Sequence, residues 1–222
     1  MGSMIELTAG DGHRFAAYRA EPKDKPRGAV VVIQEIFGVN NHIKSVADGF
    51  AADGYLVIAP ALFDRVQRNI DLGYTTGDIA AGIALKNKSP IELALRDVEA
   101  ACQAVAQAGK IGIVGYCWGG FVSWMASANV AGLACAVPYY GGGILDNANI
   151  SPKCPVMAHF GERDAMIPVD GVQKLAAQHP AHKINIYSAD HGFNCDQRGS
   201  YDAPSAKLAR ERTLAFFHKH LG

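Results

Sequence analysis

Gly115-Tyr116-Cys117-Trp118-Gly119-Gly120 follows directly on the apolar run Ile111-Gly112-Ile113-Val114. Closely spaced glycines after such a run are typical of a strand that turns abruptly into a helix, because glycine allows a tight turn and close packing. The layout is that of a nucleophile elbow with cysteine in the place of serine. Cys117 would lie at a helix N-terminus, which favours a thiolate, and the Trp118 N–H would form half of an oxyanion hole. Taken alone, the string fits a tight turn with a buried cysteine equally well.

The rest of the chain alternates between short apolar runs and helical patterns. We expect a hairpin within residues 5–19, strands at 29–33, 55–59, 111–114, 133–137, 156–160 and 184–187, and helices at 40–53, 91–107, 170–178 and 203–220. This alternation predicts an α/β fold with a mainly parallel sheet and helices on both faces, in which ligands bind at the carboxyl ends of the strands. Residues 62–90 contain glycines at 73, 77 and 82, which interrupt any helix, so we expect a partly helical excursion there that forms one wall of a cleft.

Composition limits the possible classes of function. The 222 residues suit one domain over residues 1–222, and Met1-Gly2-Ser3 before Met4 resembles a remnant of an expression vector. Lys+Arg and Asp+Glu are equal at 21 each, which argues against nucleic acid as a partner. No apolar stretch is long enough to span a bilayer, and no signal peptide is evident. We expect a cytoplasmic protein, a monomer or weak homodimer, with a small-molecule substrate.

The cysteines give a further constraint. Five are present, an odd number, and none forms a Cys-x-x-Cys pair. This argues against a disulfide framework and against a zinc site. The sequence analysis therefore expects free thiols, no metal and no cofactor.

Two more polar groups follow predicted strands. Gly161-Glu162-Arg163-Asp164 comes after the strand at 156–160, and Asp190-His191-Gly192-Phe193 comes after the strand at 184–187. The order nucleophile, acid, histidine is that of α/β-hydrolases, where histidine takes the nucleophile's proton and the acid orients the imidazole. A single aspartate in a turn or a single histidine is more often structural. Their joint occurrence in this order favours a triad of Cys117, Asp164 and His191.

With Gln34-Glu35-Ile36-Phe37-Gly38 added, these motifs resemble the dienelactone hydrolase (carboxymethylenebutenolidase) family over nearly the whole chain. The resemblance implies an α/β-hydrolase fold with Cys117 as nucleophile, His191 as base and then acid, and Asp164 as the orienting carboxylate. It implies that the N–H groups of Ile36 and Trp118 form the oxyanion hole. It also implies that Glu35 hydrogen-bonds the resting thiol and takes its proton when substrate enters. Without the resemblance, Glu35 could equally be an ion-paired glutamate.

The chain departs from the family in its arginines. Members that take dienelactone are expected to bind its carboxylate with an arginine four residues after the catalytic histidine, where this chain has Cys195. Arg198 is a nearby candidate for substrate binding, whereas neither Arg65 nor Arg68 can be matched to the second arginine. A shifted guanidinium is a weak replacement for a bidentate clamp. The sequence therefore predicts poor turnover of carboxylated dienelactone.

The leading hypothesis is hydrolysis of a lactone or small ester through an acyl-cysteine intermediate, without a cofactor. One alternative is a thioesterase or acyltransferase that uses the same acyl-cysteine. Another is a noncatalytic binding protein or thiol sensor, which would leave Asp164 and His191 unexplained.

Overall fold

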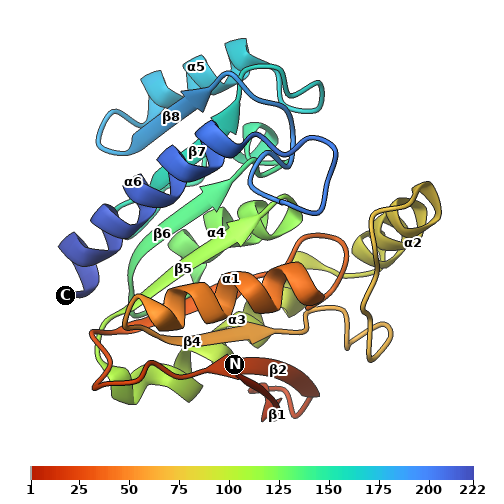
Figure 1. Ribbon diagram of the computed structural model, residues 1–222, viewed down its shortest axis with the longest axis vertical. Helices are drawn as coiled ribbons and strands as arrows, with labels where there is room; N and C mark the ends of the chain where they lie inside the picture. The colour runs from red at the N-terminus through yellow and green to blue at the C-terminus, as the bar shows by residue number, and fades with distance from the viewer. Residues whose placement is uncertain (1) are drawn as a thin grey trace.

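One eight-stranded sheet forms the centre of the computed structural model (Figure 1). The structure describes residues 2–222, so Met1, the first residue of the expected vector remnant, lies outside the described residues. The strand order is β1-β2-β4-β3-β5-β6-β7-β8. The strands are β1 (Ser3–Thr8), β2 (Arg14–Ala20), β3 (Ala29–Ile33), β4 (Leu56–Pro60), β5 (Ile111–Tyr116), β6 (Leu133–Tyr139), β7 (Met157–Gly161) and β8 (Lys183–Tyr187). The hairpin β1–β2 and its pairing with β4 are antiparallel, and the remaining pairs are parallel.

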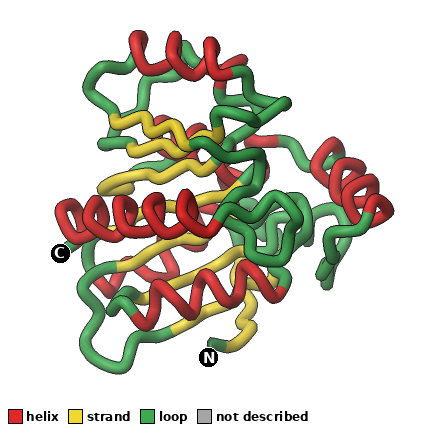
Figure 2. The backbone as a smooth tube through the Cα atoms, turned by 45° about the horizontal axis from the view of Figure 1, so that its top comes forward, coloured by secondary structure: helices red, strands yellow, loops and turns green. Residues whose placement is uncertain are grey.

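Helices cover both faces of this sheet (Figures 1 and 2). α1 (Asn41–Ala52) and α6 (Ala203–Leu221) lie on one face, and α3 (Ile91–Val105) and α4 (Trp118–Asn129) lie on the other. α5 (Val169–Gln178) packs beside β8, and two 3-10 turns, Ala106–Ala108 and Leu145–Asn147, join longer elements. The mainly parallel sheet with helices on both faces is the α/β-hydrolase fold that the sequence predicts.

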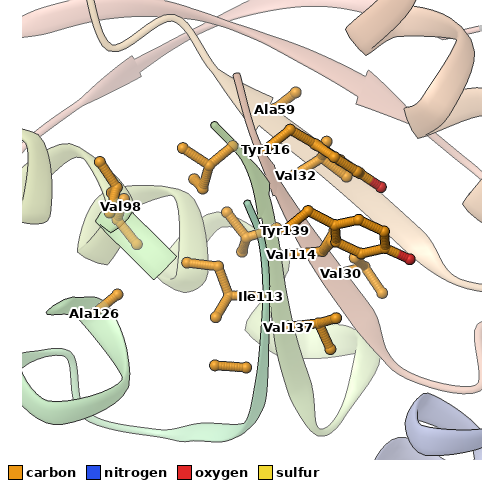
Figure 3. Packing of buried hydrophobic residues seen from close by; sticks show 14 of the residues in the cluster. Val30, Val32, Ala59, Val98, Ile113, Val114, Tyr116, Ala126, Val137 and Tyr139 are labelled. Carbon is orange, nitrogen blue, oxygen red and sulfur yellow. The ribbon is translucent and has the colours of Figure 1, made fainter. Parts of the chain in front are cut away.

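The core lies where the central strands meet these helices. All residues of β3 and β5 are buried, as expected for strands covered on both faces. Val32 of β3, Val114 of β5 and Val137 of β6 lie opposite one another in the register of the sheet, and Figure 3 shows Val30 of β3 beside Val114. Burial of this apolar surface is the main stabilising contribution to folding, and it holds the carboxyl ends of the central strands in fixed relative positions.

The excursion over residues 62–90 is partly helical, as the sequence predicts, but the expectation that its glycines interrupt any helix is wrong. α2 (Thr76–Asn87) begins at a capping box of Thr75 and Asp78 and runs through two of the glycines that were expected to interrupt it. A Cβ atom added at Gly82 would lie 2.3 Å from the Ile36 carbonyl oxygen, so glycine is needed for α2 to approach the loop after β3. Packing therefore outweighs the weak helix propensity of glycine. α2 lies beyond the carboxyl ends of the central strands (Figure 1).

The five cysteines are all unpaired thiols, as the sequence predicts. Among the helices of residues 2–222, none is both long and apolar enough to span a membrane.

Candidate active site

The register of the central strands brings two loops together. β3 and β5 pair in parallel, with Ile33 opposite Gly115 near their carboxyl ends. From β3 the chain goes to β4 on one side and later to β5 on the other side. The carboxyl ends of β3 and β5 therefore flank a topological switch point, where ligands commonly bind. The loop that carries Glu35 and Ile36 therefore lies beside the turn that carries Cys117.

That turn has the strained geometry of a nucleophile elbow. Cys117 has φ 55° and ψ −117°, a conformation that side-chain-bearing residues rarely adopt and that costs about 1–3 kcal/mol. A Cβ atom at Gly115 would lie 2.0 Å from the Gly119 carbonyl oxygen, and one at Gly119 would lie 2.4 Å from the Gln34 carbonyl oxygen. The glycines on both sides of Cys117 are therefore required by close backbone packing, and α4 begins at the next residue, Trp118.

Cys117, His191 and Asp164 form a continuous hydrogen-bonded chain. His191 Nε2 lies 3.1 Å from Cys117 Sγ, and His191 Nδ1 lies 2.7 Å from Asp164 Oδ2. The other carboxylate oxygen of Asp164 accepts a hydrogen bond of 2.9 Å from the Met166 N–H, which holds the carboxylate in place. The structure thus brings together three side chains that follow β5, β7 and β8, in the arrangement that the sequence predicts.

The environment of His191 favours its charged form. Burial alone would lower the pKa of His191, but the hydrogen bonds with Asp164 and Cys117 outweigh burial and raise that pKa to about 10. The sulfur of Cys117 thus lies beside this imidazole and at the N-terminus of α4, which are the surroundings typical of nucleophilic cysteines. The arrangement can therefore supply both a nucleophile and a proton donor.

Two backbone N–H groups are available near this thiol. Among residues 2–222, neither the Ile36 N–H nor the Trp118 N–H donates to a backbone carbonyl. Ile36 is held by α2 at Gly82, and the Trp118 ring stacks on Phe63 with a centroid distance of 5.0 Å. Both N–H groups thus belong to rigid surroundings, which suits an oxyanion hole.

Glu35 has a different partner from the one that the resemblance implies. Its Oε1 accepts a hydrogen bond of 3.3 Å from Arg198 Nη1, whereas the thiol of Cys117 is hydrogen-bonded to His191. The carboxyl group is buried, and its second oxygen, Oε2, has no hydrogen-bond partner within residues 2–222. Arg198 also lies against the Phe37 ring, with a distance of 5.8 Å from Cζ to the centroid. Glu35 is therefore ion-paired in this structure.

A cleft of about 370 Å³ opens above the thiol. Its apolar walls come from the loop after β3, from α2, from the start of α4 and from the loop after β7, and the residues are Ile36, Phe37, Ile79, Ile83, Trp118 and Met166. Cys117, His191 and Arg198 line it as well, together with the charged side chains of Lys86 and Asp146. The excursion over residues 62–90 does form one wall of the cleft, as the sequence predicts.

The structure separates the candidate arginines. Arg198 lines the cleft, but its guanidinium is paired with Glu35. Arg65 instead makes two hydrogen bonds of 2.8 Å to buried Asp97, and Arg68 pairs with Glu6. Cys195 is buried and does not line the cleft. Neither Arg65 nor Arg68 is therefore free to bind a substrate carboxylate.

Tyr140 is a neighbour of His191 that was not predicted from the sequence as part of the site. Its ring packs edge-on against His191 at a centroid distance of 5.2 Å, and its backbone has φ 34°. Tyr140 is followed by glycines at 141–143, and such a run of glycines indicates unusual backbone angles after β6. Gly143 has φ 100°. Tyr140 confines the imidazole to one orientation.

Comparison with known proteins places these features in context. Residues 15–221 match the sequence model of the dienelactone hydrolase family. A protein of Synechocystis sp. named "Putative carboxymethylenebutenolidase" is 35% identical, over 94% of this chain and 93% of its own length. One of the same name from Escherichia coli K12 is 33% identical, over 95% of this chain and 84% of its own. A crystal structure from Klebsiella pneumoniae, described as "Putative Dienelactone Hydrolase", has a TM-score of 0.84 and 32% identity, covering 98% of this chain and 99% of its own.

Proposed function

This chain belongs to the dienelactone hydrolase family of lactone and ester hydrolases, and from this premise we propose that it acts through an acyl-cysteine intermediate on Cys117. The observation that carries the proposal is the chain of hydrogen bonds from Cys117 Sγ through His191 to Asp164, with lengths of 3.1 and 2.7 Å. A buried structural thiol would need neither the strained turn at Cys117 nor an oriented imidazole beside it.

The first half of the proposed reaction forms a thioester. Cys117 Sγ attacks the carbonyl carbon, and the resulting oxyanion accepts hydrogen bonds from the Ile36 and Trp118 N–H groups. When the tetrahedral intermediate collapses, the bond between the carbonyl carbon and the ester oxygen breaks, and His191 protonates the departing oxygen. In a lactone this step opens the ring and leaves the product joined to Cys117 through its acyl group.

The second half hydrolyses the thioester. His191, neutral after giving up its proton, removes a proton from a water molecule as that water attacks the same carbonyl carbon. The bond to sulfur breaks, the carboxylic acid leaves, and the thiolate of Cys117 and the imidazolium of His191 are restored. Asp164 keeps Nδ1 protonated in both halves, so that Nε2 always faces the reacting atoms.

For Glu35 we propose a role in controlling the thiol, through its ion pair with Arg198. The buried carboxylate holds Arg198 at the cleft, and a carboxylate that moved toward Cys117 would disfavour a thiolate there. Glu35 also neutralises the Arg198 guanidinium, which a substrate carboxylate would need as its partner.

The cleft supports a neutral substrate with an apolar group. Its walls are largely apolar, and Arg198 is already paired. Lys86 is exposed, so a carboxylate bound to it would remain in water and gain little from the ion pair. We therefore propose a neutral lactone or aryl ester as the preferred substrate class, in place of carboxylated dienelactone.

Trapping of the intermediate tests this function. The enzyme is mixed with a slowly hydrolysed neutral aryl ester, quenched in acid and analysed by intact mass and peptide mapping. We expect one acyl group per chain, on Cys117, which is absent in Cys117→Ala and retained in the control Cys102→Ala. A survey of lactones, aryl esters and acyl thioesters then separates hydrolysis of esters from the thioesterase alternative. Turnover by purified Cys117→Ala above a few per cent of the wild-type rate would end the proposal.

A further inference from the structure

A second cluster of ligand-type side chains lies behind the cleft. One carboxylate oxygen of Glu35, one ring nitrogen of His42 and Cys195 Sγ all lie within 4.8 Å of one another. The three residues come from distant parts of the chain, namely the loop after β3, the first turn of α1 and the loop between β8 and α6. We call them the Glu35–His42–Cys195 cluster.

The cluster is buried and contains two polar atoms without partners. Glu35, His42 and Cys195 are 1%, 3% and 0% exposed. Glu35 Oε2 and His42 Nε2 have no hydrogen-bond partner within the described residues. Each buried polar atom left in this state costs about 1–3 kcal/mol, so a ligand that engages both atoms would remove a substantial penalty.

Both residues are already oriented by their other polar atoms. His42 Nδ1 lies 3.3 Å from Asp196 Oδ1, and Glu35 Oε1 accepts from Arg198. When one ring nitrogen of a histidine binds a metal, the other nitrogen commonly donates a hydrogen bond to a carboxylate, which fixes the orientation and tautomer of the ring. Asp196 is in this position on Nδ1 of His42. The unpartnered Nε2 is then the nitrogen left to bind a ligand.

We propose that the Glu35–His42–Cys195 cluster is a binding site for a thiophilic divalent transition metal of the Zn²⁺ type. Thiolate, imidazole and carboxylate together are the donor set of zinc, whereas Mg²⁺ and Ca²⁺ take oxygen donors. The Glu35 carboxylate, a Cys195 thiolate and the Asp196 carboxylate on His42 together balance the dication and the Arg198 guanidinium, and water completes four-coordination. Ligand atoms of a tetrahedral zinc site lie roughly 3.3–3.8 Å apart, so the side chains would close in by about 1 Å.

A surface cavity gives the metal a route to the cluster, and none of the described residues lines both this cavity and the cleft. His42 forms part of the lining of a surface cavity of about 320 Å³, together with Asp196, Tyr201, Lys207 and Arg210. The side chain of Asp196 is 67% exposed, whereas that of His42 is 4% exposed, so the pair leads from solvent to the buried cluster. A cation would therefore meet an exposed carboxylate first and the buried ligands next.

The sequence predicted no metal because its five cysteines include no Cys-x-x-Cys pair. The three ligands of this cluster have no local spacing pattern in the chain, so a search for such patterns could not find them. Glu35 of the cluster is ion-paired with Arg198, which lines the cleft, so a metal bound to the cluster would affect the control of the Cys117 thiol proposed above. Only this effect on the Cys117 thiol rests on the proposed function. Metal binding itself does not require that the protein be a hydrolase.

The test uses protein without an affinity tag in the Cys117→Ala background, where the cleft has no thiol. After treatment with a chelator, Co²⁺ is titrated and followed by absorption, and Zn²⁺ affinity is measured by competition with a chromophoric chelator. We expect one Co²⁺ per chain with a thiolate-to-metal charge-transfer band. The band is lost in Cys195→Ser, and Zn²⁺ affinity falls at least tenfold in His42→Gln. Cys154→Ser, which alters a buried thiol outside the cluster, leaves both unchanged.

Thermal unfolding gives a second readout that does not depend on spectra. Zn²⁺ that binds the native state raises Tm by mass action in the Cys117→Ala protein, and much less in the double variant with His42→Gln. Circular dichroism without metal verifies that each variant is folded. No stoichiometric binding, as expected if the cluster holds only water, would overturn the proposal, and so would binding that is indifferent to both Cys195→Ser and His42→Gln.

Discussion

Gly82→Ala is expected to impair catalysis from a helix that carries no catalytic group. The added Cβ atom would lie 2.3 Å from the Ile36 carbonyl oxygen, whereas ordinary contacts begin at 3.4 Å. Relief of this overlap requires a shift of about 1 Å in the residue whose N–H is assigned to the oxyanion hole. A hydrogen bond of about 2.9 Å lengthened by that amount is no longer a hydrogen bond.

The size of the effect follows from the loss of one such donor, which lowers kcat by about 10²- to 10³-fold. The interaction strengthens only in the transition state, so KM should change by no more than a few-fold. The matched control is Gly77→Ala in the same helix, where the nearest atom would be Thr75 Oγ1 at 3.8 Å. Both substitutions increase helix propensity by about 1 kcal/mol, so this contribution cancels between them.

The assay measures kcat and KM on a neutral aryl ester for the wild type and both variants, with Tm as the check on folding. We expect Gly77→Ala to lie within twofold of the wild type. If Gly82→Ala is folded and also turns over at the wild-type rate, then α2 yields to the added methyl group instead of Ile36, and the argument that α2 positions the oxyanion hole is refuted.

Four further predictions concern the triad and the cleft. Cys117→Ala should lower kcat by about 10⁴- to 10⁶-fold in a folded protein, and more than a few per cent of residual activity would exclude this residue as the nucleophile. Glu35→Gln should reduce turnover and alter the rate at which iodoacetamide labels the thiol, and wild-type values of both across pH would leave Glu35 without a role. A neutral lactone or aryl ester should give a higher kcat/KM than a carboxylated analogue of matched size, and the opposite preference would mean that Arg198 is released from Glu35 to bind the carboxylate. The raised pKa of His191 stabilises the fold fully below about pH 6.5, and this stabilisation is lost as pH rises to about 10. Urea unfolding should therefore show Asp164→Asn most destabilised relative to the wild type near pH 6, with a difference that shrinks by pH 10; a constant difference would contradict the assignment.

The fold and the grouping of Cys117, Asp164 and His191 could be predicted from the sequence because both depend on local patterns. Buried strands such as β3 and β5 appear as unbroken β-branched runs, and the glycines around Cys117 mark the turn after β5. Parallel strands have their carboxyl ends at one edge of the sheet, so groups that follow three strands must lie near one another. Cys117, Asp164 and His191 could thus be placed together before their distances were known.

The remaining features depend on contacts that no spacing in the chain encodes. Arg198 and Glu35 are 163 residues apart and meet only because the loop after β8 folds over the loop after β3. The same folding turns Cys195 inward, toward His42 and away from the cleft. Gly82 appears to be a helix breaker until the approach of α2 to Ile36 is seen. Strands and helices repeat with a period that the sequence displays, whereas loops and ion pairs have no period. The sequence by itself therefore determined the fold and the grouping of Cys117 with Asp164 and His191, and only the tertiary structure decided the partner of Glu35, the walls of the cleft and the surroundings of Cys195.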